Sequence, residues 1–297
     1  MPRINKSIEL LEQDQPVYLD IHYGIDTDHP FEDGVRAAHT WADLIDVDLE
    51  RSFFDVPVLA EFMRGLAAAG PTATGHRTPA VYVTLPIAGT SEASIWANAW
   101  MIWQVLNTGV HGIMLCQAES AEAVRAFVEA VRYPFHTIGE GDKLGEGRRG
   151  HSGEHTAAPI WGLSIDEYLR SADVWPLNPR GEIMLGLKLE NKHALANAEA
   201  VTNVPGIAFA EWGPGDMRWS LLRSIPRPGE PRPPELLAAR ARIFAACKAN
   251  HIAFLDGVVA DNVTARIDEG VRVCPVAPRE AGPTVVEIGR KHTRHSL

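Results

Sequence analysis

The sequence predicts one (β/α)8 barrel, and three observations support this fold class. Eight short apolar runs rich in β-branched residues alternate with longer amphipathic stretches, a pattern typical of a parallel sheet whose strands are joined by helices. The chain has 297 residues, which accommodates a barrel of about 250 residues with added segments. No GxGxxG motif follows the first run, so we favour the closed barrel over the alternative, an open doubly wound sheet.

The eight apolar runs are the expected strands, because each is short and apolar enough to be buried on both faces of a parallel sheet. In chain order they span residues 16–23, 43–49, 79–86, 111–116, 182–190, 206–212, 251–257 and 270–276. Several of the stretches between them carry apolar residues at helical spacing and are expected helices. The clearest of these span residues 56–70, 91–109, 120–132 and 233–250.

Two segments are longer than ordinary loops. Residues 133–180 hold a Gly- and charge-rich piece followed by a short helical pattern at 163–173. Because this segment follows a helix, it starts at the end of the barrel opposite the catalytic face, and its length would let it cross the top or contact a neighbour. Residues 223–235 are rich in Pro and Arg and are predicted to be a stiff connector. We expect residues 1–297 to form a single domain around these additions.

Composition and charge exclude several classes of protein. Apolar residues make up 45% of the chain and charged residues 22%, which indicates a folded protein and not a disordered one. With 28 basic and 38 acidic residues, the net charge of -10 disfavours nucleic acid or anionic lipid as a partner. Cys116, Cys247 and Cys274 lie in apolar settings without a CxxC motif, so we predict buried thiols in a reducing compartment.

The start of the chain is polar and lacks the apolar core of a signal peptide, and no apolar run reaches the roughly 18 residues of a membrane span. Together with the thiols, this predicts a cytoplasmic protein without a membrane partner.

Carboxylates at two neighbouring strand ends are the first candidates for chemistry, because a barrel assembles its active site at the carboxyl ends of its strands. Alternation places Lys188 and Glu190 on one side of the fifth strand, and Asp216 follows the sixth strand in Gly213-Pro214-Gly215-Asp216. Glu190 and Asp216 could bind Mg²⁺ or Mn²⁺ and leave positions for water and a bidentate substrate. The alternative is that they act as helix caps or partners of an Arg.

The first two strands supply further candidates. The second strand ends in Asp48-Leu49-Glu50-Arg51, where Glu50 and Arg51 could form an ion pair or extend an acidic cluster beside the metal. On the first strand His22 shares a face with Asp20 and could act as a general base near neutral pH, or be structural. Neither a GxSxG motif nor an activated cysteine supports a covalent Ser or Cys nucleophile.

At this point the residues resemble those of the HpcH/HpaI aldolase family. Three segments carry the resemblance: DLIDVDLERSFFD, GIMLCQAESAEAVRAFVEAVRYP, and LKLENKHALANAEAVTNVPGIAFAEWGPGDM, in which a strand ends in Glu190 and a later turn ends in Asp216. The stretch GRRG followed by WGLSIDEYL is similar as well. The resemblance implies a barrel of the phosphoenolpyruvate/pyruvate-binding type and a class II pyruvate aldolase, in which a divalent metal binds a 2-oxo acid and stabilises its enolate.

The resemblance also assigns roles to particular residues. Glu190 and Asp216 would hold the metal, and Asp48 and the turn of Trp212, Gly213, Pro214 and Gly215 would bind the substrate. The chain departs from the family at four positions. The catalytic His is replaced by Arg51, its partner Asp by Asn107, an Arg that contacts the 2-oxo oxygen by Thr84, and a Gln by Lys188.

Two classes of function follow from these departures. The first is a metal-dependent carbon–carbon lyase that acts on a small 2-oxo acid and an aldehyde, with Arg51 or Lys188 supplying positive charge and His22, Glu50 or a metal-bound water as base. A variant of it forms a Schiff base on Lys188. The second is a homologue without aldolase activity that keeps the scaffold to bind an acid metabolite.

The resemblance further implies a homotrimer or homohexamer in which a C-terminal helix is exchanged between subunits. The tail from Pro283 carries Val285, Val286 and Ile288, which look exposed in sequence and would gain little in a monomer. The alternative is that the tail packs on its own barrel.

Overall fold

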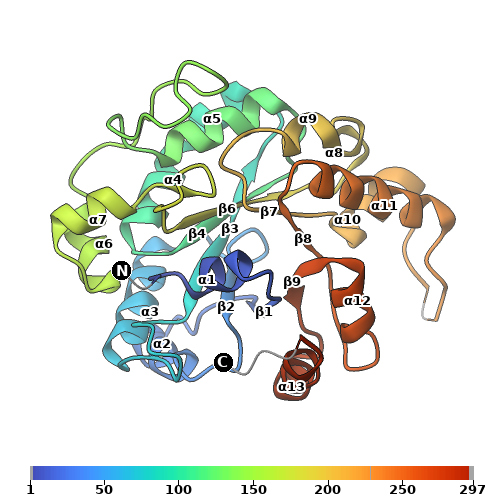
Figure 1. Ribbon diagram of the computed structural model, residues 1–297, viewed down its shortest axis with the longest axis horizontal. Coiled ribbons are helices and arrows are strands. Elements are labelled where there is room, and N and C mark those ends of the chain that lie inside the picture. Colours follow the sequence, from blue (N-terminus) through green and yellow to red (C-terminus); the bar gives the residue numbers. More distant parts are fainter. Residues whose placement is uncertain (1–2, 228, 294–297) are drawn as a thin grey trace.

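The computed structural model describes residues 3–227 and 229–293, and its centre is a closed barrel of eight parallel strands. The strand order is β4-β3-β2-β1-β9-β8-β7-β6, and β4 pairs with β6 to close the circle, so the predicted barrel is confirmed (Figure 1). The barrel strands are β1 Val17–His22, β2 Leu44–Asp48, β3 Ala80–Ala88, β4 Gly112–Cys116, β6 Ile183–Lys188, β7 Phe209–Glu211, β8 Ala253–Leu255 and β9 Val271–Pro275.

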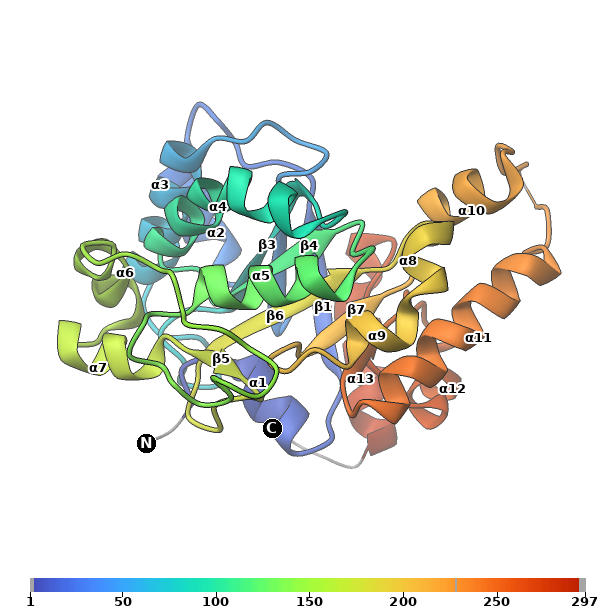
Figure 2. The ribbon, with the colours of Figure 1, turned by 90° about the horizontal axis from the view of Figure 1, so that it is seen from above.

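Helices surround the barrel, and α10 and α11 extend outward together on the right of Figure 2. Three of the long helices begin at side-chain caps: Asp55 caps α3, Ser91 caps α4 and Ser120 caps α5. The helices are α1 Lys6–Glu12, α2 Pro30–Ala37, α3 Val56–Ala68, α4 Glu92–Asn107, α5 Ala121–Val131, α6 Glu154–Trp161, α7 Ile165–Ser171, α8 Lys192–Ala196, α9 Ala198–Thr202, α10 Pro214–Leu222, α11 Pro234–Ala249, α12 Val263–Glu269 and α13 Gly282–Thr293.

The interior of the barrel has an apolar lower part and a polar upper part. Val17, Leu44 and Phe209 point inward near the amino ends of their strands, and Ile8 and Leu10 of α1 join the same apolar cluster. Farther along the strands the inward positions become charged, as the next subsection describes. Helix α1 therefore covers the amino end of the barrel, while the charged side chains face its carboxyl end.

The long segment at 133–180 contains more regular structure than the sequence predicts. Besides the expected helix, now α7, it forms α6 and a two-residue strand, β5 Val174–Trp175, which pairs with β6 outside the barrel. A Pro at position 159 inside α6 disguises that helix in the sequence. The segment is held by Arg132, which donates to both oxygens of Asp173 at 2.7 and 3.2 Å.

The C-terminal helix α13 packs on its own barrel. Val285 is fully buried, and Val286 and Ile288 are partly buried against the same apolar core. Arg290 of this helix donates to Asp43 and to the carbonyl of Pro16. The premise that the tail exposes its apolar side chains is therefore wrong for residues 283–293, and residues 294–297 lie outside the described part. Among the described residues, no helix combines the length and the apolar character needed to cross a bilayer.

Candidate active site

A cluster of charged side chains lies at the carboxyl end of the barrel, and we refer to it as the lumen cluster. It combines six carboxyl groups with two cations, so acidic groups outnumber basic ones. Its members are Asp46, Asp48, Glu50, Arg51, Lys188, Glu190, Glu211 and Asp216. The parallel register brings them together, because Lys188 pairs with Glu211 on β7 and Asp48 pairs with Thr84 on β3. The sequence predicts six of these eight residues as site residues.

Lys188 lies at the centre of the lumen cluster. Its ammonium group donates to Glu50 and lies 3.1 Å from Oε2 of Glu190, while its side chain is almost completely buried. Burial opposes the charged form, but the surrounding acidic groups, with Glu211 and Glu190 among them, outweigh burial and raise the pKa of Lys188. Lys188 is therefore a permanent cation in this site.

Glu190 has one carboxylate oxygen without a hydrogen bond. Its Oε1 accepts from the backbone N–H of Gln117 at 3.1 Å, whereas its buried Oε2 has no hydrogen-bonding partner among the described residues. Burial raises the pKa of Glu190 to about 7, although Lys188 opposes this shift. Gly213 adopts a left-handed φ of 47° and packs so closely that an added Cβ would lie 2.2 Å from the Cβ of Glu190. Only glycine lets the following turn pass this close to the carboxylate.

Arg51 links the second strand to the turn after β7. Its Nη1 donates to Oδ2 of Asp48 at 3.0 Å, and its Nη2 lies 3.8 Å from Oδ2 of Asp216 in the first turn of α10. Asp48 also accepts from the backbone N–H groups of Glu50 and Arg51, which fixes this strand end. The structure thus pairs Arg51 with Asp48, and not with Glu50 as the sequence suggests. About half of the Arg51 side chain remains exposed, so its charge can reach a bound ligand.

Asp46 and Glu211 are members of the lumen cluster that the sequence analysis missed. Asp46 is buried and accepts from the hydroxyl of Thr84 at 2.9 Å, and burial together with Asp48 raises its pKa well above the usual range. Burial likewise raises the pKa of Glu211. Strand alternation could have found Asp46, because it lies two residues before Asp48, whereas Glu211 is recognised only from its register with Lys188.

His22 is not part of the lumen cluster. On β1 the inward positions are Leu19 and Ile21, so His22 points outward, where its ring lies 6.1 Å from that of Phe62. There Nε2 of His22 lies 3.1 Å from both Oδ2 of Asp20 and Nη2 of Arg279. The structure separates His22 from the other predicted catalytic residues, which removes the geometric basis for its role as base.

Two other positions singled out in the sequence also lie outside the lumen cluster. Trp212 is fully buried and donates through Nε1 to Asp256 at 3.1 Å, so its side chain anchors the start of the turn in the interior. Asn107 ends α4 and contacts α6, where its carbonyl accepts from Thr156. Thr84, by contrast, faces the lumen of the barrel, and its hydroxyl donates a hydrogen bond to Asp46.

The donor set fits a divalent metal ion. Ligand atoms of Glu50, Cys116 and Glu190 lie within 4.8 Å of one another, and Oε2 of Glu190 lacks a hydrogen bond. Burial raises the pKa of Cys116, so its thiol stays protonated and is a poor ligand for Mg²⁺ or Mn²⁺. Asp216 is not a member of that close group but follows directly on the turn that packs against Glu190. The excess of carboxylates over cations favours an added cation here.

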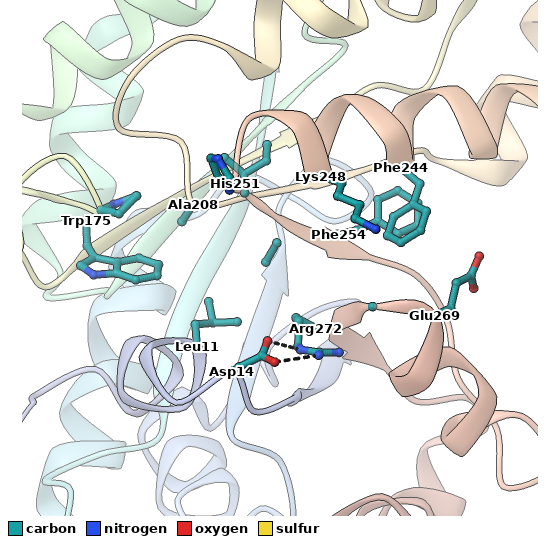
Figure 3. A pocket seen from close by; sticks show the side chains of 14 residues that line it. Leu11, Asp14, Trp175, Ala208, Phe244, Lys248, His251, Phe254, Glu269 and Arg272 are labelled. Carbon is teal, nitrogen blue, oxygen red and sulfur yellow. Dashed lines mark hydrogen bonds and ion pairs between the residues drawn. The ribbon is translucent and has the colours of Figure 1, made fainter. Parts of the chain in front are cut away.

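The cavities of the molecule differ between the two ends of the barrel. A narrow cavity of about 30 Å³, lined by Asp48, Arg51, Lys188 and Glu211 among others, leads into the lumen cluster. A larger cavity of about 470 Å³ lies at the amino end, where Figure 3 shows Arg272 paired with Asp14 beside aromatic side chains of α11 and β8. The larger cavity contains none of the lumen cluster.

Comparisons with known proteins match the chain to one family model and to several curated relatives. A family model described as HpcH/HpaI aldolase/citrate lyase matches residues 87–272. A hydroxypyruvate/pyruvate aldolase of Delftia acidovorans is 28% identical over 148 residues, which cover 50% of this chain and 47% of that protein. The chain thus spans about half the length of the curated relatives it matches first.

Solved structures share the fold over nearly the whole chain. A HpcH/HpaI aldolase/citrate lyase family protein of Burkholderia cenocepacia has a TM-score of 0.70 at 21% identity, with 98% of each chain covered. A citrate lyase beta subunit of M. tuberculosis, solved with oxaloacetate and magnesium, has a TM-score of 0.54 at 17% identity and covers 95% of this chain and 97% of its own.

Proposed function

The chain belongs to the HpcH/HpaI aldolase/citrate lyase family, as its motifs predict, and on this premise we propose that it is a carbon–carbon lyase acting on the enolate of pyruvate or a related 2-oxo acid. The observation that carries the proposal is the lumen cluster, in which Glu190, the turn at Gly213 and Asp216 meet at the carboxyl end of the barrel. The curated relatives named as pyruvate aldolases and the citrate lyase subunit with bound oxaloacetate support a 2-oxo acid as substrate.

We assign Glu190 and Asp216 as the residues that would hold a divalent metal, Mg²⁺ or Mn²⁺, with Glu50 beside them. Such an ion supplies positive charge to the substrate oxygen on which negative charge develops during enolisation. The backbone N–H groups at Gly215 and Asp216, in the first turn of α10, would bind the substrate carboxylate. The magnesium in the related citrate lyase subunit supports this choice of ion.

Arg51 and Lys188 supply the positive charge that the family obtains from an Arg at the position of Thr84. The guanidinium of Arg51 is half exposed above the narrow cavity, so it can orient the oxygens of an incoming acid. Lys188 is buried and held by Glu50 and Glu190, so it contributes a fixed cation below the substrate. Both cations would act on the enolate oxygen without leaving their carboxylate partners.

The contacts of Lys188 disfavour the variant in which this residue forms a Schiff base. A lysine attacks a carbonyl as the neutral amine, whereas the carboxylates around Lys188 raise its pKa and keep it protonated. Borohydride added with pyruvate is therefore expected to leave the mass of the protein unchanged. A stable adduct on Lys188 would restore the Schiff-base variant.

The decisive experiment is proton exchange into pyruvate. With Mn²⁺ or Mg²⁺ present, we expect solvent deuterium to enter the methyl group of pyruvate, measured by proton NMR, and chelation of the metal to stop it. No exchange with any of several divalent ions and 2-oxo acids would favour the alternative, a homologue that binds an acid metabolite without turnover.

Assembly and location stay predictions. We propose a homotrimer or homohexamer, and light scattering that gives about 32.5 kDa would rule it out. The three cysteines are unpaired and buried, which supports a reducing compartment such as the cytoplasm.

A further inference from the structure

The proposed reaction needs a proton acceptor, and His22 lies outside the lumen cluster, but one carboxyl group of the cluster is free to take this role. Three of the other acids accept hydrogen bonds: Glu50 from Lys188, Asp48 from Arg51, and Asp46 from Thr84. Oxygens of Glu190 face Lys188 and Gln117, and Asp216 faces Arg51. Among the described residues, the carboxyl group of Glu211 makes neither a hydrogen bond nor an ion pair.

The position of Glu211 suits contact with a substrate. It ends β7, two residues before Gly213, and its side chain lines the narrow cavity together with Asp48, Arg51 and Lys188. It is partly accessible, whereas Asp46 is buried and lies one inward position deeper on its strand. A molecule that binds at the turn and reaches into the cavity therefore meets Glu211 first.

We propose that Glu211 is the residue that moves the proton to and from C3 of the 2-oxo acid. This inference rests on the proposed function. When the enolate forms, the C3–H bond breaks, the proton binds to a Glu211 oxygen, the C–H electron pair becomes the C2=C3 bond, and the carbonyl pair moves to the C2 oxygen. In the cleavage direction Glu211 accepts the proton of the C4 hydroxyl, the O–H electron pair becomes the C4=O bond of the aldehyde, and the C3–C4 bond breaks. The C3–C4 pair becomes the C2=C3 bond and the carbonyl pair moves to the C2 oxygen. The protonated Glu211 then gives this proton to C3 of the enolate after the aldehyde leaves. No other reactant is needed.

The groups around Glu211 affect the protonation of its carboxyl group. Burial raises the pKa of Glu211 above its usual range, while Lys188 and Arg51 oppose that shift and favour the ionised form. Six charged or titratable groups of the barrel and its strand ends act on Glu211, and Asp256, which follows β8 and pairs with Arg240, adds to them; the six are Asp46, Glu50, Arg51, Tyr82, Lys188 and Glu190. The two cations and the neighbouring acids thus act in opposite directions on the protonation of this carboxyl group.

The test compares the wild type with Glu211→Gln, and with Glu122→Gln, an exposed glutamate on α5, as matched control. We expect Glu211→Gln to slow deuterium entry into pyruvate by about a hundredfold or more. Its affinities for Mn²⁺ and oxalate, measured by calorimetry, and its melting temperature should match those of the wild type. The wild-type exchange rate should rise with pH as Glu211 ionises, and this rise should vanish in the variant.

Each other outcome overturns the inference in a recognisable way. Unchanged exchange in Glu211→Gln assigns the proton transfer to another group. Loss of Mn²⁺ binding makes Glu211 a metal ligand. Exchange that fails in the wild type itself, with every metal and 2-oxo acid tried, removes the proposed function and this inference together, which distinguishes it from failure of the variant alone.

Discussion

Two charged clusters lie on either side of the barrel wall, and they differ in how completely their charges are paired. In the outer cluster, Arg240 donates to Asp256 at 2.7 Å and to both oxygens of Glu269 at 2.6 and 2.8 Å, and Arg266 also binds Glu269. Two cations thus meet two carboxylates. The lumen cluster holds two cations and six carboxyl groups, and it leaves Glu190 Oε2 and Glu211 without hydrogen bonds among the described residues. The outer cluster thus has a cation for each carboxylate, whereas the lumen cluster has acids with raised pKa values and no cation partner for each, which is typical of functional sites.

The largest expected effect is loss of metal binding in the lumen cluster. Glu190→Gln or Asp216→Asn removes an anionic oxygen from the proposed metal site without removing a core contact, so Mn²⁺ binding should disappear while the protein stays folded. Calorimetry with Mn²⁺ and a thermal melt measure the two quantities, with Glu122→Gln as control. Unchanged affinity in both variants would show that the metal binds elsewhere or not at all.

The outer cluster should respond in the opposite way. Arg240→Met removes the cation that is paired with the buried Asp256, so the free energy of unfolding should fall by about 3 kcal/mol. Mn²⁺ affinity should stay at the wild-type level. Denaturant unfolding measures the loss, and Arg64→Met, an exposed arginine on α3, is the control. If Arg240→Met unfolds at the wild-type midpoint, the balanced pairing contributes nothing to stability and the comparison fails.

Arg51 tests whether a cation of the lumen cluster acts on the substrate. Arg51→Ala should lower kcat by about a hundredfold, because donors to a developing oxyanion typically contribute about 2.7 to 4 kcal/mol. Metal affinity should change little. If Arg51 instead only supports Asp48, the same variant should melt at lower temperature and turn over normally. A stable Arg51→Ala protein with normal turnover would refute both roles.

The smallest effect concerns the pH dependence of the outer cluster. Hydrogen bonds from Arg240, and then from Arg266, lower the pKa of Glu269 to about 2. An acid whose pKa is lowered by folding stabilises the protein above its unfolded pKa of 4.5 and loses that contribution as pH falls toward 2. Glu269→Gln should thus cost about 1 kcal/mol at pH 7, because solvent screens this partly exposed pair, and progressively less between pH 5 and 3. A difference that stays constant over this range would contradict the assignment.

The sequence predicts the barrel well because the strands are short apolar runs separated by helical patterns. Seven of the eight predicted runs contain the whole observed strand, and the run 79–86 ends two residues before β3 does. It predicts less well which face of a strand points inward. In a parallel barrel both faces are buried, so alternation relates residues to each other without stating which set lines the lumen. For this reason the sequence suggests His22 as a site residue although it points outward, and gives no signal for Glu211 although it points inward. Only the register between strands resolves the two cases.

The helix α1 has a consequence for the movement of small molecules. Ile8 and Leu10 are buried in the apolar layer that fills the amino end of the barrel, so in the described part of the chain the lumen cluster opens at its carboxyl end. A barrel interior is packed and is not a pore. Substrate, product and the protons exchanged with solvent would therefore all pass through the opening at the carboxyl end. A molecule bound in that opening would block the passage of the others. Under the proposed function, a product bound at this opening must therefore leave before the next substrate molecule can enter.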